Sequence, residues 1–141
     1  MMLTRKTKPS DWIEPMPAKQ FHRIEKAFRK HGGVFVMGEE ADIILNMQGA
    51  EAVTLNENTI LFRKKPSRSA VYEELIHTYQ FKSGKCDGSR MSRLFNEIEA
   101  KKKLLKYAEA YELTGREIHI TSRMLASCEE EMEKLRKEQR I

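Results

Sequence analysis

The chain has 141 residues, about the size of one domain. Hydrophobic residues make up 40% of it and charged residues 33%, and no apolar run approaches the roughly eighteen residues that a membrane span needs. The formal net charge is +5. The basic residues are scattered over the N-terminal tail, a strand end and a helix that carries Lys101, Lys102 and Lys103 among glutamates. This pattern favours solvated charge, so we expect no membrane and no nucleic-acid partner.

Residues 1–18 hold three of the four prolines and are predicted to be a flexible lead-in to a single domain, 19–141. Basic residues near the N-terminus are not followed by an apolar stretch, so the segment does not read as a Sec signal peptide. Cys86 and Cys128 show no C-x-x-C spacing, which predicts free thiols in a reducing, cytoplasmic setting.

The first half of the chain predicts short helices and strands in alternation. From the periodicity and the turn residues, the expected elements are a helix over 20–30, a strand over 34–37, a helix over 39–47, and hairpin strands over 52–55 and 59–63.

The second half predicts helices only. Ser67 or Ser69 can cap a helix that runs to about Lys82. A long helix is expected over about 92–113, and the capping box of Thr114 and Glu117 predicts a last helix that ends near residue 137.

The most informative stretch lies on the helix that follows the hairpin. Glu73 and His77 are four residues apart, so both lie on one helix face and could bind the same ion, while Glu74 lies beside them. A zinc-peptidase helix usually reads His-Glu-x-x-His, with two imidazole ligands and a glutamate base. Here Glu73 occupies the place of the first histidine.

The next helix offers a third ligand. Glu97 heads a stripe of apolar residues at helical spacing that includes Ala100 and Leu104, so it should point inward, where a carboxylate needs a partner. Glu99 shares its face with lysines and is expected to be solvated. Glu97 is therefore the predicted ligand.

The order of these motifs resembles a small gluzincin-type metallopeptidase domain. The chain is similar in particular to the compact zincin-like domains of bacterial polymorphic toxins and prophage-borne proteins, with the Glu-Glu-x-x-His motif starting at Glu73 and a Glu-x-Glu-Ala motif starting at Glu97. The resemblance implies an α+β zincin-like fold, in which a small N-terminal sheet and hairpin pack on the motif helix and two long helices follow. Lys101 departs from it, because such domains often carry an acid there.

This resemblance implies a metal-dependent hydrolase of toxin or prophage type that cleaves a protein or peptide, either cytoplasmic or delivered by a specialised secretion system. Glu73, His77 and Glu97 would bind the metal, and Glu74 would be the catalytic base. Two carboxylates and one imidazole suit zinc, and also manganese or another divalent ion.

Two alternatives remain open from the sequence. The polar residues of the motif helix could simply decorate its outer face, opposite an apolar stripe that includes Tyr72 and Tyr79 and would form core. The chain would then be a non-catalytic binding module that kept a zincin scaffold and lost the metal. A di-iron bundle is disfavoured, because it needs two Glu-x-x-His motifs on separate helices and the sequence has one.

Overall fold

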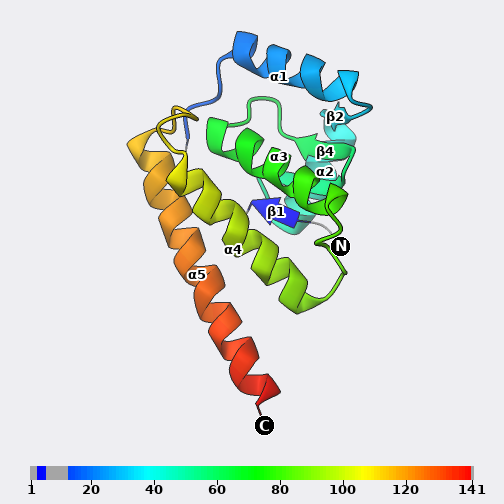
Figure 1. Ribbon diagram of the computed structural model, residues 1–141. Coiled ribbons are helices and arrows are strands. Elements are labelled where there is room, and N and C mark those ends of the chain that lie inside the picture. Colours follow the sequence, from blue (N-terminus) through cyan, green and yellow to red (C-terminus); the bar gives the residue numbers. More distant parts are fainter. Residues whose placement is uncertain (1–2, 6–12, 141) are drawn as a thin grey trace.

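The computed structural model describes residues 3–5 and 13–140 and shows a mixed α+β fold (Figure 1). In chain order the elements are β1 (Leu3–Arg5), α1 (Ala18–Lys30), β2 (Val34–Val36), α2 (Glu39–Gln48), β3 (Ala52–Asn56), β4 (Thr59–Phe62), α3 (Arg68–Lys82), α4 (Arg90–Lys106) and α5 (Gly115–Gln139). Within the described residues no helix combines the length and the apolar character needed to cross a membrane.

The strands form one small sheet in the order β1-β3-β4-β2. β3 and β4 are the predicted hairpin, and its turn is tightened by the Asn58 backbone N–H, which donates to Asn56 Oδ1 at 2.8 Å. β1 pairs antiparallel with β3, and β2 pairs parallel with β4. The two short strands therefore lie at the edges.

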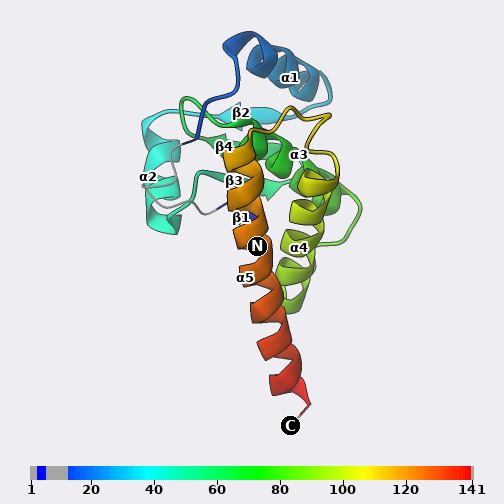
Figure 2. The same cartoon turned by 90° about the vertical axis from the view of Figure 1, so that its left-hand side faces the viewer.

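Alternation along the hairpin strands gives the sheet two covered faces. Val53 and Leu61 pack against α2 on one face, together with Leu45. On the other face Ile60 and Phe62 belong to a larger cluster with residues of α1 and α3. Figure 2 shows α2 on one side of the sheet, with α3 and α4 on the opposite side.

Local capping fixes where the long helices begin. The Ser67 hydroxyl accepts from the backbone N–H of Ala70 and starts α3, and Thr114 with Glu117 forms the predicted capping box of α5. Glu117 has a second contact, because its Oε2 accepts from the backbone N–H of Ser69 at 2.6 Å. One buried carboxylate thus ties the first turn of α5 to the first turn of α3.

Two expectations about the chain's organisation are wrong. The flexible lead-in over 1–18 fails for residues 3–5, which pair in the sheet, and for Met16, which is buried in the core. Residues 1–2 and 6–12 of that lead-in lie outside the described part. The helix expected over 92–113 ends at Lys106, and turns follow over 107–112, with Glu112 at a φ of 54°.

The structure contradicts the alternative in which the polar residues of α3 decorate an outer face. Its polar residues Glu73, Glu74, His77 and Gln80 are fully buried, whereas Tyr79, expected in the core, is 58% exposed. The polar side faces β3, β1 and α4 because α3 is enclosed by these elements on that side, with Thr54, Arg5 and Glu97 as partners. On the apolar side Val71 is buried in the core and Tyr72 and Leu75 pack against it, so the expectation of core is wrong for Tyr79 alone among the two tyrosines.

Candidate metal centre

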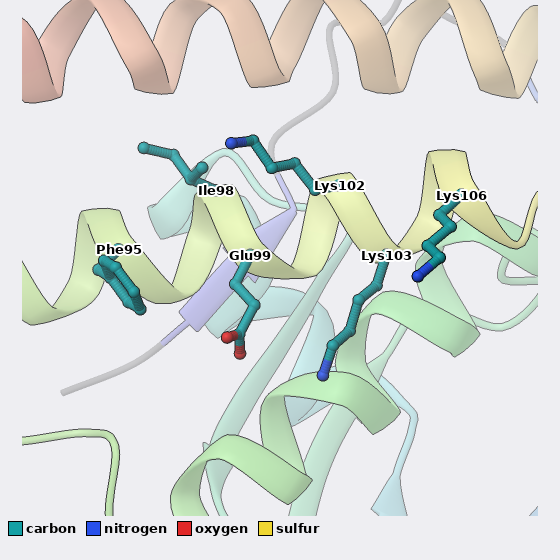
Figure 3. A pocket seen from close by; sticks show the side chains of 6 residues that line it. All are labelled: Phe95, Ile98, Glu99, Lys102, Lys103 and Lys106. Carbon is teal, nitrogen blue, oxygen red and sulfur yellow. The ribbon is translucent and has the colours of Figure 1, made fainter.

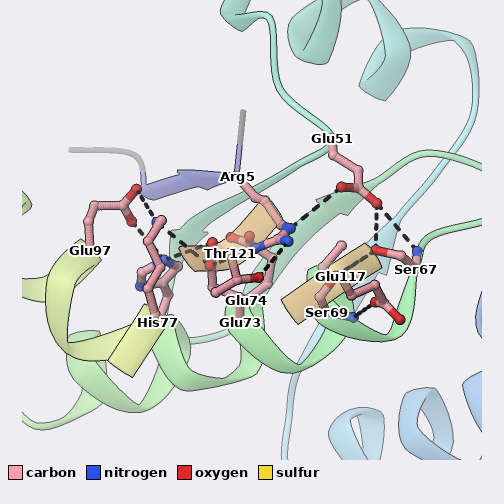
Figure 4. Close-up of polar contacts among 12 residues, drawn as sticks. Arg5, Glu51, Ser67, Ser69, Glu73, Glu74, His77, Glu97, Glu117 and Thr121 are labelled. Carbon is pink, nitrogen blue, oxygen red and sulfur yellow. Dashed lines mark hydrogen bonds and ion pairs between the residues drawn. The ribbon is translucent and has the colours of Figure 1, made fainter. Parts of the chain in front are cut away.

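One turn of α3 brings three potential ligands together. Atoms of Glu73, Glu74 and His77 that could bind a metal lie within 4.8 Å of one another, and all three side chains have no solvent exposure. Figure 4 shows them on the side of α3 that faces β1 and α4. A divalent ion could be held by this group, and carboxylate and imidazole are both common ligands of such ions.

α4 places Glu97 against the same group. Its Oε1 lies 2.8 Å from His77 Nε2, and Glu73 Oε2 lies 3.9 Å from the same nitrogen on the other side. Glu97 sits on the inward stripe of α4 with Ala100 and Leu104, which are buried as the spacing predicted. The structure therefore brings together all four residues that the sequence singled out.

Two buried cations complete the cluster. Arg5 Nη1 donates to Glu73 Oε1 at 3.0 Å, and Lys101 Nζ lies 3.6 Å from the same oxygen. Lys101 also donates to Glu97 Oε2 at 3.4 Å, one helical turn away. Glu73 and Glu97 thus each have one carboxylate oxygen paired with a cation and the other oxygen turned toward His77. Lys101 was expected to be solvated, and this expectation is wrong because α4 turns it inward.

Gln80 fixes the imidazole of His77. Its Oε1 lies 2.7 Å from His77 Nδ1, and its Nε2 donates to the Asn96 backbone carbonyl and to Glu99 Oε1, both at about 3 Å. If Nδ1 carries the proton and donates it to the amide oxygen, Nε2 is left with a free lone pair toward Glu97. Such a contact to the second ring nitrogen is typical of metal-binding histidines.

Glu74 is held by the sheet. The Thr54 hydroxyl, on β3, lies 2.9 Å from Glu74 Oε1 and donates to it. Neither Arg5 nor Lys101 forms an ion pair with Glu74 in the described part of the chain. Its environment therefore differs from that of Glu73 and Glu97, which both contact a cation.

Four atoms of this cluster are buried without a hydrogen-bond partner among the described residues. They are Glu73 Oε2, Glu74 Oε2, His77 Nε2 and Glu97 Oε1. The 2.8 Å contact between His77 and Glu97 is a close ion pair that lacks the directionality of a hydrogen bond. Buried polar atoms are nearly always satisfied, so four such atoms at one place call for a physical explanation.

The charges of the cluster perturb one another. Burial raises the pKa of Glu74 to about 8, with Glu73 and Glu97 adding to the rise. Burial disfavours the imidazolium of His77, but the carboxylates, Glu97 first, outweigh it and raise its pKa to about 9. Burial likewise disfavours the carboxylate of Glu97, but Lys101 and then His77 lower its pKa to about 2. The pKa of Lys101 is raised, since Glu73 and Glu97 outweigh its burial.

Contacts around Arg5 extend the cluster to the far end of the chain. Its Nη2 donates to the Thr121 hydroxyl on α5 at 3.0 Å, and its Nε lies 3.6 Å from Glu51 Oε2. The other oxygen of Glu51 accepts from the Ser67 hydroxyl at 2.7 Å. Figure 4 shows this row of polar contacts running from Glu97 to Glu117.

Sequence reasoning missed three members of the cluster, Arg5, Lys101 and Gln80. Lys101 shared the inward stripe of Glu97, one turn on, which was an available signal; Gln80 lay three residues after His77 on the same face. Arg5 had no such signal, because its partners are far away in the sequence. Glu99, expected to be solvated, is half-buried and accepts from Gln80, with Lys85 as its ion-pair partner at 3.3 Å.

Cys86 and Cys128 are free thiols, as the sequence predicts. The other histidines, His22, His31 and His119, are exposed and lie outside the cluster. Comparison of the chain with known protein families, with curated proteins and with solved structures finds no match. The structure itself shows an α+β fold with a buried Glu-Glu-x-x-His cluster that could bind a metal.

Proposed function

We propose that this chain is a metal-dependent hydrolase of zincin type that cleaves protein or peptide substrates. Glu73, His77 and Glu97 hold a divalent ion, and Glu74 is the general base. The observation that carries the proposal is the set of four buried atoms, one from each of these residues, that converge without a hydrogen-bond partner among the described residues. Of the four, His77 Nε2 and Glu97 Oε1 meet each other in an ion pair, and an ion at their centre would take the place of that pair and also satisfy Glu73 Oε2 and Glu74 Oε2.

Distances within the cluster fit this assignment. Two ligands of a tetrahedral zinc ion lie about 3.3 Å apart when each is about 2.0–2.1 Å from the metal. The contacts of His77 Nε2 with Glu97 Oε1 and Glu73 Oε2, 2.8 and 3.9 Å, bracket that separation. The donor set suits zinc, and manganese or another divalent ion is the alternative.

The residues around the ligands have a defined part in the proposal. Arg5 and Lys101 hold the outer oxygens of Glu73 and Glu97, and Gln80 holds the outer nitrogen of His77. Contacts of this kind fix the orientation of ligands. Lys101 thus stands where similar domains often carry an acid, and it pairs directly with the carboxylates of the two glutamate ligands.

Glu74 has the geometry of a proton acceptor. Thr54 holds its Oε1, and its Oε2 remains free beside His77. A divalent ion bound there would supply a Lewis acid and a water of lowered pKa. Glu74 would take the proton from the attacking water and pass it to the leaving amine.

The zincin assignment rests on the resemblance together with the order of elements. A hairpin precedes the motif helix, and the helix after it carries Glu97, as the resemblance implies. The toxin or prophage context, and delivery by a specialised secretion system, rest on the resemblance alone.

A second candidate function is a non-catalytic binding module. It is favoured by the full burial of Glu73, Glu74 and His77, and by the match of three carboxylates with three groups that can be cationic, Arg5, Lys101 and a protonated His77. In this case the cluster only holds α3 and α4 together. A proton on His77 would take the place of the metal.

Metal content and cleavage decide between the two. We would strip wild type with chelator, add zinc or manganese, and measure bound metal, melting temperature and cleavage of a peptide library. Wild type should bind one ion per chain and cleave. Glu74→Gln should keep the ion and lose about a hundred- to ten-thousand-fold in rate. The matched control Glu109→Gln removes an exposed carboxylate and should behave as wild type.

Each failure has its own meaning. If wild type binds no ion at millimolar metal, the metal proposal is wrong and the binding module is the better account. If it binds an ion but Glu74→Gln cleaves as fast as wild type, Glu74 is not the base. If it binds an ion and cleaves no peptide, the hydrolase is excluded and the ion is structural.

A further inference from the structure

The exposed side of α3 forms part of a surface rich in tyrosine. All four tyrosines of the chain, Tyr72, Tyr79, Tyr107 and Tyr111, line one hollow of about 380 Å³ between α3 and the end of α4. Tyr79 is 58% exposed and Tyr107 45%. Tyrosine combines a large apolar ring with a polar end and is enriched in interfaces, so such a gathering indicates a binding surface.

Two further hollows adjoin this one. Lys103 also lines a hollow of about 300 Å³ along α4, where Phe95 is 56% exposed (Figure 3). Tyr79 also lines a hollow of about 320 Å³ that reaches Phe28 at the end of α1. We call the three hollows together the tyrosine groove. Its central residues are Tyr72, Leu75, Ile76, Tyr79, Lys103 and Tyr107.

The groove carries more positive than negative charge. Lys82, Lys102, Lys103 and Lys106 line it, against the carboxylates of Glu57 and Glu99. Glu99 is already paired with Lys85 and accepts from Gln80, so its charge is largely compensated. The complementary ligand is therefore an anion with apolar groups.

Peptide fits the groove better than nucleic acid. The floor between the tyrosines is aliphatic, formed by Leu75 and Ile76, and suits apolar side chains. Ring faces on which bases could stack are partly occupied: Tyr72 stacks on Tyr111 with centroids 4.3 Å apart, and Lys103 Nζ lies 5.6 Å from the Tyr79 ring. No arginine, the residue best suited to phosphate, is among the described residues that line the three hollows.

We propose that the tyrosine groove binds an acidic peptide segment of a partner protein. Aliphatic or aromatic side chains of the segment fill the hollows, and its carboxylates pair with the lysines at the rim. The groove uses the side of α3 opposite to Glu73 and His77, so this proposal holds whether or not the buried cluster binds a metal.

Selection from an unbiased peptide library tests the proposal. Phage-displayed random twelve-residue peptides would be selected against the wild-type chain, and their affinities measured against two double variants. Tyr79→Ser with Lys103→Glu removes a central aromatic and reverses a charge in the groove. The matched control, Met47→Ser with Lys137→Glu, likewise removes an exposed large apolar side chain and reverses a lysine charge, at exposed positions of α2 and α5. Melting curves check that both variants fold.

The selected peptides should be rich in Asp and Glu around apolar residues, and their binding should weaken with salt. The groove variant should lose at least about tenfold in affinity, and the control should match wild type. A chain that selects no peptide, peptides without acidic residues, or peptides that bind the groove variant as well as wild type would overturn the proposal. A twelve-nucleotide oligothymidylate is tested in parallel. If only this oligonucleotide binds, and only the groove variant loses it, the groove is a nucleic-acid site instead.

Discussion

The two sides of α3 make opposite use of the same helix. The side with Glu73, Glu74 and His77 is polar and has no solvent exposure, while the side with Tyr72 and Tyr79 is apolar and partly open to solvent. Burial of apolar surface drives folding, and burial of charge opposes it unless every charge is paired. In α3 charged side chains are buried and apolar side chains are partly exposed, which opposes both tendencies. Exposed apolar surfaces and buried clusters of charge are both typical of functional sites.

The buried side should be sensitive to the loss of a single charge. Lys101→Met removes a cation that contacts both Glu73 and Glu97, so the buried Glu73 keeps only Arg5 and Glu97 keeps only His77 as a positively charged partner. We expect the free energy of unfolding to fall by about 3–5 kcal/mol, measured by denaturant titration. Lys102→Met, at the exposed neighbouring position, should stay within about 0.5 kcal/mol of wild type. A Lys101 variant as stable as wild type would mean that the ion pairs contribute nothing.

Metal affinity should separate the two glutamates of α4. Glu97→Gln replaces a proposed ligand and should weaken zinc binding by more than the about 100-fold that loss of an outer contact can cost. Glu99→Gln keeps an acceptor for Gln80 at the edge of the cluster and should change affinity by about tenfold or less. Competition with a chelator of known affinity measures both. Equal losses would show that Glu97 is not a ligand.

Loss of the contact between Gln80 and His77 Nδ1 should have an intermediate effect on metal affinity. Gln80→Leu removes the group at 2.7 Å from Nδ1, so the imidazole is no longer held in one orientation. Zinc affinity should fall by about 10–100-fold, measured by the same competition. Gln80→Glu, which keeps an acceptor at this position, is the matched comparison and should retain more of the affinity. Unchanged binding in the leucine variant would separate Gln80 from the metal site.

The exposed side should tolerate change. Tyr79→Ser removes a side chain that is more than half exposed, so the free energy of unfolding should stay within about 0.5 kcal/mol of wild type. Denaturant titration of this variant beside Lys101→Met gives the direct comparison. A large loss of stability would mean that Tyr79 belongs to the core after all, and that the groove is a packing feature.

Turns and helix caps of this fold could be predicted from the sequence, but which helix side is buried could not be predicted for α3. The hairpin, a serine cap at Ser67 or Ser69 and the Thr114–Glu117 capping box depend on neighbouring residues and were predicted correctly, and the structure assigns the cap to Ser67. The end of α4 was misplaced, because the chain turns after Lys106 without a glycine or proline to mark it. Glu97 was found from its apolar stripe, since such a stripe indicates which side of a helix faces inward.

What the sequence could not supply was the direction in which α3 faces. A helix with an apolar side and a polar side predicts the polar side in water, and only the approach of β1 and α4 reverses that assignment. Arg5 illustrates the reason: it lies in a proline-rich segment with no local pattern, and its place is set by Glu73 and Thr121, 68 and 116 residues away. Contacts of this range leave no trace in periodicity.

The same long-range contacts have a consequence for how the chain comes to be folded. Arg5 precedes Thr121, to which it donates, by 116 residues, and Thr121 lies on α5. Domains fold as units during synthesis, and contacts between distant residues form slowly because long loops must close first. The hairpin and its neighbours can form early, but the polar cluster is completed only when α5 has been added. A truncated chain that ends before α5 keeps Arg5 and Lys101, the cations of Glu73 and Glu97, but it lacks Thr121, so it should leave the buried Arg5 side chain with one donor unsatisfied.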